Sequence, residues 1–473
     1  MTPFGNWKFN FFSTSPQNQR SFAEQKATII PINSSRADKN RGRTVSRRTF
    51  LKHCSLAGLG FAAPIGWRTL AGAAEEKTES AGYPGPYYVV FNASGGWDTT
   101  YLMDPKGVDG INRLYQSGDI RSAGELKYAP TAKHVASGMS NEDFFTKYGS
   151  ELRVLNGLDL SVNNHTPCAR YMATGKLDSL AYPAFPALVA ACHGAEAPLA
   201  FLTFGNYSAT GNLVPMSRVP YLQSLKLLAR ADYVEGGTHP YQDEFVSGRI
   251  ERTLEQQFKA RVSDARLPRV ERSQSMLYAA QTNSKALQRV VPYIPEVQSK
   301  ERLAQQNDIA LAAFKAGVCI SANLSIGQFD SHNNNDVDQM KLIPEFLAGI
   351  DDLLRKAEAL QIRDKLVVIV QSEMGRTPNY NNGNGKDHWS IGSIMFLGPG
   401  IAGNRVIGAT DDKQQLVPIN PQTLTIDQDK GIRVRPEHIH LALREFAGVQ
   451  DHAFSKKFPL GVADNEQLKK FWI

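Results

Sequence analysis

Acidic and imidazole side chains stand directly after several apolar runs of this sequence. They are Asp98, Asp330, His332, Glu373 and the pair Asp387-His388, which lies in a glycine-rich loop before a further apolar run. Ligands of open α/β sheets bind at the carboxyl ends of strands, so side chains that follow strands are candidates for one shared site. Carboxylates and imidazoles together suit zinc, manganese or a similar divalent ion. The pattern predicts a metal site, although each acid alone could cap a helix or hold a turn.

His165 begins a predicted helix shortly after the apolar run at 152–155. The positive end of a helix dipole disfavours an imidazolium ion, so we expect a neutral ring. A neutral imidazole could bind the metal, act as a general base on water, or attack phosphorus directly, and we favour these roles in that order. Arg376 follows Glu373 closely and could hold an anionic substrate, with a structural ion pair as the alternative.

The elements that must position these side chains follow from the apolar pattern. Short apolar runs bounded by turn residues occur at 87–92, 152–155, 199–204, 322–326, 366–370 and 394–397. Helical patterns lie between several of them, at 178–192, 302–318, 337–359 and 436–447. This alternation predicts an α/β fold with a central, mostly parallel sheet flanked by helices.

A polar stretch at about 206–300 interrupts the alternation. It contains one long helical pattern at about 244–287, which we interpret as a helical insertion beside the sheet. Residues 74–85 are typical of a linker, so the predicted domain spans 86–473.

Charge is distributed unevenly along the chain. The 473 residues include 53 Lys and Arg against 46 Asp and Glu, a formal net charge of +7. Residues 1–73 hold eleven of the basic side chains and two of the acids, so the rest of the chain is slightly acidic. Its composition therefore gives no reason to expect a nucleic-acid partner.

The basic N-terminal region has the order of a twin-arginine export signal. Ser46–Lys52 reads SRRTFLK, an apolar stretch follows at 54–66, and Ala71-Gly72-Ala73 offers a small-residue cleavage site. The apolar stretch is shorter than the roughly 20 residues of a membrane span. We therefore expect a signal region at 1–73, and a periplasmic or otherwise exported protein with no stable membrane span after cleavage.

Several motifs together resemble the DUF1501 family of exported bacterial proteins. The matching segments are Gly95-Gly96-Trp97-Asp98, Phe329-Asp330-Ser331-His332, Ser372–Pro378 and Asp387-His388. The resemblance extends through 399–408 and the helix at 436–448. The family is similar to the alkaline phosphatase and sulfatase superfamily, which implies an α/β sandwich with one or two metal ions at the strand ends.

The superfamily resemblance implies a role for each position. Asp98 matches a metal ligand after the first strand, and His165 stands where the superfamily has a hydroxyl or thiol nucleophile. Asp330, His332 and His388 match the ligands of one ion, with open positions for catalysis. Glu373 matches the acidic ligand of a second metal site. Met374 replaces the imidazole of that second site, so we expect one metal ion rather than two.

These features predict an exported metal-dependent hydrolase that uses a metal-activated water to cleave phosphate or sulfate esters. Its partner would be an anionic ester substrate. The alternative is a non-catalytic metal-binding or assembly protein with an exported protein partner, which Met374 and the missing nucleophile favour. In a third hypothesis, His165 is phosphorylated to form a phosphoenzyme, from which the phosphoryl group is transferred.

Overall fold

The computed structural model describes residues 82–107, 111–130, 139–229, 243–264 and 284–473, with 267–268, 270–271 and 273–274. The chain divides into two units, Met1–Thr78 and Glu79–Ile473. The predicted signal region and most of the predicted linker lie outside the described residues. Within the described ranges, no helix is long and apolar enough to cross a membrane.

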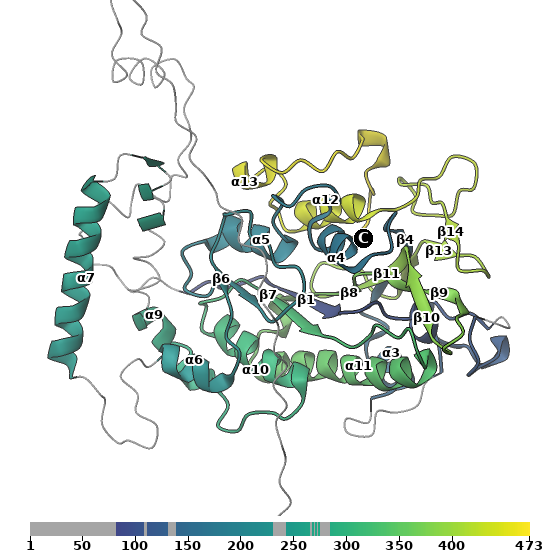
Figure 1. Ribbon diagram of the computed structural model, residues 1–473, viewed down its shortest axis with the longest axis horizontal. Coiled ribbons are helices and arrows are strands. Elements are labelled where there is room, and N and C mark those ends of the chain that lie inside the picture. The colour runs from purple at the N-terminus through teal and green to yellow at the C-terminus, as the bar shows by residue number, and fades with distance from the viewer. Residues whose placement is uncertain are drawn as a thin grey trace, which may run out of the picture. The chain divides into compact units, whose positions relative to one another are not determined.

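An eight-stranded sheet lies at the centre of the second unit, in the order β12-β4-β11-β8-β1-β7-β5-β6 (Figure 1). The strands are β1 Tyr87–Ala93, β4 Arg153–Asp159, β5 Phe201–Thr203, β6 Met216–Ser217, β7 Ser321–Ile326, β8 Leu366–Ser372, β11 Ile391–Leu397 and β12 Arg405–Ile407. All pairings are parallel except those of β11, which runs antiparallel to β4 and β8. The predicted mostly parallel sheet is therefore confirmed.

Helices cover both faces of the sheet, as Figure 1 shows. One face carries α3 Asn141–Tyr148, α10 Arg302–Lys315 and α11 Asn335–Ala359; the other carries α4 His165–Thr174, α5 Phe185–Gly194 and α12 Pro436–Phe446. Successive side chains of a strand point to opposite faces, so Val89 and Phe91 join the first core while Tyr88 and Val90 join the second. Both faces are apolar because both are covered.

The predicted insertion contains the helices α6 Leu222–Ala229, α7 Glu244–Asp264 and α9 Ser284–Gln288. The single long helix predicted at 244–287 is described as α7 up to Asp264, as helical residues at 268, 270–271 and 273–274, and as α9 from Ser284. Strand β6 lies in the same range of the sequence and extends the main sheet. The range 206–300 therefore also contributes a strand to the sheet.

The remaining elements are short. They are η2 Thr99–Tyr101, η3 Ser117–Asp119, β2 Arg121–Ala123, β3 Leu126–Tyr128, η4 Val291–Tyr293, η5 Arg363–Lys365, β9 Gly375–Tyr380, β10 Lys386–Trp389, β13 Ala409–Thr410, β14 Leu416–Val417, α13 Ala453–Lys456 and η6 Asp464–Glu466. Among them the antiparallel hairpin β9–β10 matters most, because it carries Arg376 and His388 at facing positions.

The central strands bring distant segments to one edge of the sheet. Strand β1 pairs in parallel with β7 and with β8, and Ala93 lies opposite both Ile326 and Ser372. The segments that follow these strands therefore leave the sheet together. Gly95, with a φ of +119°, makes this possible, since a Cβ there would lie 2.5 Å from the backbone nitrogen of Asp330.

Candidate metal centre

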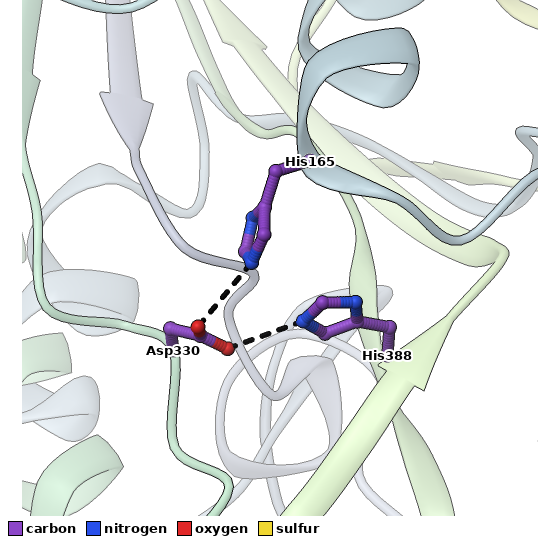
Figure 2. Close-up of side chains that lie close together, drawn as sticks. All are labelled: His165, Asp330 and His388. Atoms are coloured by element: carbon purple, nitrogen blue, oxygen red, sulfur yellow. Dashed lines mark hydrogen bonds and ion pairs between the residues drawn. The ribbon is translucent and has the colours of Figure 1, made fainter. Parts of the chain in front are cut away.

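Four side chains from three parts of the chain converge beyond this edge. His165 is the first residue of α4, Asp330 and His332 lie between β7 and α11, and His388 lies on β10. Figure 2 shows the rings of His165 and His388 directed at the Asp330 carboxylate from different elements. The sequence-based prediction that Asp330, His332 and His388 lie together agrees with this arrangement.

The distances between their polar atoms are short. Asp330 Oδ2 lies 3.3 Å from His165 Nε2, and Asp330 Oδ1 lies 3.2 Å from His388 Nε2 and 3.2 Å from His332 Nε2. The two Nε2 atoms of His332 and His388 are 3.0 Å apart. Ligand atoms of His165, Asp330 and His388 all lie within 4.8 Å of one another, which makes them a candidate metal-binding group.

The other ring nitrogen, Nδ1, of each histidine already has a hydrogen-bond partner. Nδ1 of His332 contacts Asp387 Oδ1 at 3.0 Å, and Nδ1 of His165 contacts Glu373 Oε1 at 3.0 Å. Nδ1 of His388 contacts the carbonyl oxygen of Asn163 at 2.9 Å. Carboxylate and carbonyl oxygens only accept hydrogen bonds, so each Nδ1 donates its proton. In a neutral ring, Nε2 then carries a lone pair directed at Asp330.

This set of donor atoms fits a divalent cation. Tetrahedral zinc, with bonds of about 2.0–2.1 Å to nitrogen, requires ligand atoms about 3.3 Å apart. The separations of 3.2–3.3 Å between Asp330 and the three rings, and of 3.0 Å between His332 and His388, are close to that value. Lone pairs this close repel each other unless a proton or a metal ion lies between them.

The protonation states follow from the surroundings. Partial burial opposes ionisation of Asp330, but the hydrogen bond and charge of Arg376 outweigh it and lower the pKa of Asp330 to about 2. Burial lowers the pKa of His388, which favours the neutral ring that a metal requires.

His165 differs from the sequence-based expectation. Its hydrogen bond to Glu373, reinforced by the charges of Glu373 and Asp330, raises the pKa of His165. The direction of this shift is opposite to the one that the helix dipole alone would give. Two nearby carboxylates have a larger effect than the partial charge of a helix terminus.

Arg376 holds the site from within the protein. Its side chain is fully buried, and Nη2 donates to Asp330 Oδ1 at 2.7 Å. The guanidinium also donates to the carbonyl oxygens of Gly95, Gly96 and Lys386. Every nitrogen of the guanidinium has a protein acceptor, so the structure agrees with the ion-pair alternative and not with a substrate contact.

Asp98 is separate from the histidine group. Its carboxylate is fully buried and accepts from Lys386 Nζ at 2.7 Å and from Asn335 Nδ2 at 3.0 Å. The other oxygen caps η2 by accepting from the Thr100 backbone and hydroxyl. All of these contacts are structural, so the structure corrects the prediction of Asp98 as a metal ligand and agrees with the helix-cap alternative.

Glu373 also lies outside the candidate group. Oε1 accepts from His165 Nδ1 and from the Gly95 backbone at 2.9 Å, while the buried Oε2 has no hydrogen-bond partner among the described residues. Glu373 therefore orients His165 instead of facing the cation position directly, which corrects its prediction as a ligand.

Two residues of the site give no signal in the sequence. Lys386 looks like an ordinary loop lysine, yet it begins β10 and its side chain is fully buried. Asn381 is one of several asparagines in its loop, yet its Nδ2 donates to the carbonyl of His332 and to Asp387 Oδ1, both at 3.0 Å. Its Oδ1 accepts from the backbones of Gly383 and Gly385. Asn381 thus fixes Asp387, which orients His332.

Solved structures with similar folds include sulfatases and an alkaline phosphatase. The PsFucS1 sulfatase from Pseudoalteromonas sp. has 11% identity and a TM-score of 0.35, with 80% of this chain and 69% of that chain covered. The lipoteichoic acid synthase LtaP from Listeria monocytogenes has 8% identity and a TM-score of 0.32, with 72% of each chain covered. A mutant TAB5 alkaline phosphatase with bound Mg has 10% identity and a TM-score of 0.29, covering 67% and 92%. TM-scores this low support no inference about activity.

The sequence comparisons match only part of the chain. No curated protein matches the chain. The model of the family described as "Protein of unknown function (DUF1501)" matches residues 243–437, which include Asp330, His332, Glu373, Arg376 and His388, and it confirms the family resemblance over that range.

Proposed function

We propose that this protein is an exported metal-dependent hydrolase of phosphate or sulfate esters. The observation that carries the proposal is the convergence of three imidazole Nε2 atoms on the Asp330 carboxylate, each ring held at Nδ1 by its own acceptor. Metal-binding histidines characteristically have such a partner on the other nitrogen. The resemblance to the alkaline phosphatase and sulfatase superfamily supplies the class of reaction.

Asp330, His332 and His388 would hold one divalent cation, with zinc or manganese expected from the nitrogen and oxygen donors. When bound, such an ion polarises an ester oxygen and lowers the pKa of a water molecule. Asp330 supplies the negative charge of the group, and the buried Arg376 fixes the orientation of its carboxylate. The Asn381–Asp387 contact fixes the His332 ring in the same way.

His165 can take two roles at this position. Its Nε2 faces the group while Glu373 holds Nδ1, a histidine–carboxylate pair suited to accept a proton from an attacking water. The same Nε2 could instead complete the ligand set. The roles differ in outcome, because His165→Ala would retain the metal and lose turnover if the ring is a base, but would lose metal affinity if the ring is a ligand.

A positively charged group in the site must neutralise the negative charge of the ester substrate. The sequence predicts Arg376 as the group that holds an anionic ester, but all of its nitrogens donate to the protein. We propose instead that the bound cation neutralises the charge of the ester group.

The test is elemental analysis of the mature protein, purified from a host with an intact twin-arginine route. We expect about one divalent ion per chain, together with hydrolysis of an aryl phosphate or aryl sulfate. His332→Ala should abolish both, while His193→Ala, a control at a histidine outside the group, should not. Metal-free protein whose stability does not change on chelation would contradict the proposal.

The predicted export is tested by replacing both Arg47 and Arg48 with lysine, which should leave the protein in the cytoplasm.

A second candidate function is metal-dependent assembly without catalysis. It is favoured by the imidazole at position 165, where the superfamily has a nucleophile, and by the complete engagement of Arg376. This function predicts stoichiometric metal but no turnover of either ester class, so the same experiment distinguishes the two.

A further inference from the structure

Gln339 is a polar residue at a core position of α11. Its exposed fraction is 0%, and Leu342 and Phe346, which follow it at helical spacing on the same face, are buried in the first core. A buried side-chain amide destabilises a fold unless its polar atoms have hydrogen-bond partners. A glutamine where the helix pattern favours an apolar residue therefore indicates that its hydrogen bonds have a specific role.

The amide of Gln339 connects two loops that leave the sheet at the metal centre. Its Oε1 accepts from the backbone nitrogen of Asp98 at 3.0 Å, in the loop after β1. Its Nε2 donates to the carbonyl oxygen of Phe329 and to Ser331 Oγ, both at 3.0 Å, in the loop after β7. A rotated amide would direct its NH2 group at the Asp98 N–H and its oxygen at the Phe329 carbonyl. The partners therefore fix the observed orientation.

The two residues that Nε2 contacts lie immediately before and after Asp330. The Asp330 side chain is 42% exposed, so packing around it does not fix its direction, which depends on the backbone that carries it. Arg376 holds the carboxylate at 2.7 Å, and Gln339 holds the neighbouring residues from the opposite end. Ser331 extends this support, because its Oγ donates to Asn335 Oδ1 at 2.6 Å.

We infer that Gln339 is a positioning residue of the metal centre. It holds the loop of Asp330 and His332 in the conformation in which the Asp330 carboxylate faces the imidazoles, and it does not contact the cation itself. Without the amide, this loop loses its hydrogen bonds to α11 and has more conformations in the metal-free protein. Binding then includes the entropic cost of ordering the loop, which lowers the metal affinity. The inference rests on the proposed metal-dependent function.

The test compares Gln339→Met with the control Asn307→Leu. Methionine has nearly the shape of glutamine but lacks the amide. Asn307 of α10 is also 0% exposed, and its Nδ2 donates at 2.8 Å to the carbonyl oxygen of Gly349, within α11 and not in a loop of the site. Both variants lose the hydrogen bonds of a buried amide, so both should lower the urea midpoint of the metal-free protein.

The two variants should differ in metal binding. Calorimetric titration of the folded proteins with Zn²⁺ should show about tenfold weaker binding in Gln339→Met and unchanged binding in Asn307→Leu. The visible spectrum of bound Co²⁺, which reports the arrangement of its ligands, should change only in Gln339→Met. A purely structural role would lower the stability of both variants and leave the Zn²⁺ affinity and the Co²⁺ spectrum of both unchanged.

Ser331→Ala keeps the test decisive if Gln339→Met does not fold. It removes one of the two 3.0 Å bonds of Nε2, so it should weaken Zn²⁺ binding several-fold and alter the Co²⁺ spectrum in the same direction. Unchanged Zn²⁺ affinity in the folded variant, or an equal loss of affinity in Asn307→Leu, would overturn this inference alone. If the unchanged protein binds no Zn²⁺, the proposed function is refuted together with it.

Discussion

Replacing Asp98 by asparagine is expected to destabilise the fold strongly while leaving metal affinity nearly unchanged. Asp98 and Lys386 are both fully buried, and their charged atoms lie 2.7 Å apart. Loss of one partner of a buried ion pair leaves an unpaired charge and typically costs about 3–5 kcal/mol. The rings of Tyr380 and Tyr101, at 5.1 and 5.5 Å from Lys386 Nζ, offset about 1 kcal/mol of this. We therefore expect a loss of about 2–4 kcal/mol.

The assay is urea unfolding of the metal-free protein in chelator, followed by calorimetric titration of the folded protein with zinc. The variants are Asp98→Asn, Lys386→Met and the double variant. Removal of both charges leaves neither one buried alone, so the double variant should lose about 2 kcal/mol less than the sum of the single losses. Asp330→Asn is the comparison, because its carboxylate is 42% exposed and faces the candidate metal position. It should abolish zinc binding with a smaller loss of stability.

The opposite pattern would refute this reasoning. If Asp98 were a metal ligand, Asp98→Asn would abolish zinc binding and Lys386→Met would not restore it. Additive losses in the double variant would also show that the two charges do not stabilise each other.

The remaining predictions concern the support of the metal centre and the dependence of stability on pH. Asp387→Asn should weaken zinc binding about 10–100-fold by calorimetry, because the His332 ring loses its carboxylate partner, whereas the exposed Asp412→Asn should bind zinc like the unchanged protein. Burial lowers the pKa of His440 to about 4, so the folded ring stays neutral while the unfolded ring takes up a proton near pH 6.5. The unfolded state then binds more protons, and stability is lost as the pH falls below about 6.5, by roughly 2 kcal/mol at pH 5. Urea midpoints at pH 7.5 and 5.0 should differ less in His440→Gln than in the unchanged protein, and an equal difference would exclude His440 as the cause.

The sequence by itself determines the sheet and the place of the site. Short continuous apolar runs bounded by turn residues, such as 366–370, favour strands buried on both faces, and parallel strands bring their carboxyl ends to one edge. The place of Asp330 and His332 follows from that geometry, whereas His388 lies on β10, ahead of the antiparallel strand β11. The twin-arginine pattern is likewise a property of local sequence, although it lies outside the described residues.

Only the tertiary structure decides which carboxylate forms an ion pair, which faces the candidate metal position and which orients a histidine. Asp98, Asp330 and Glu373 all follow strands, yet the first pairs with Lys386, the second faces three imidazoles and the third holds His165. Lys386 lies 288 residues from Asp98, and Glu373 lies 208 residues from His165. The role of a carboxylate depends on which donor lies within about 3 Å, and such distances between remote segments are fixed by packing and not by local sequence.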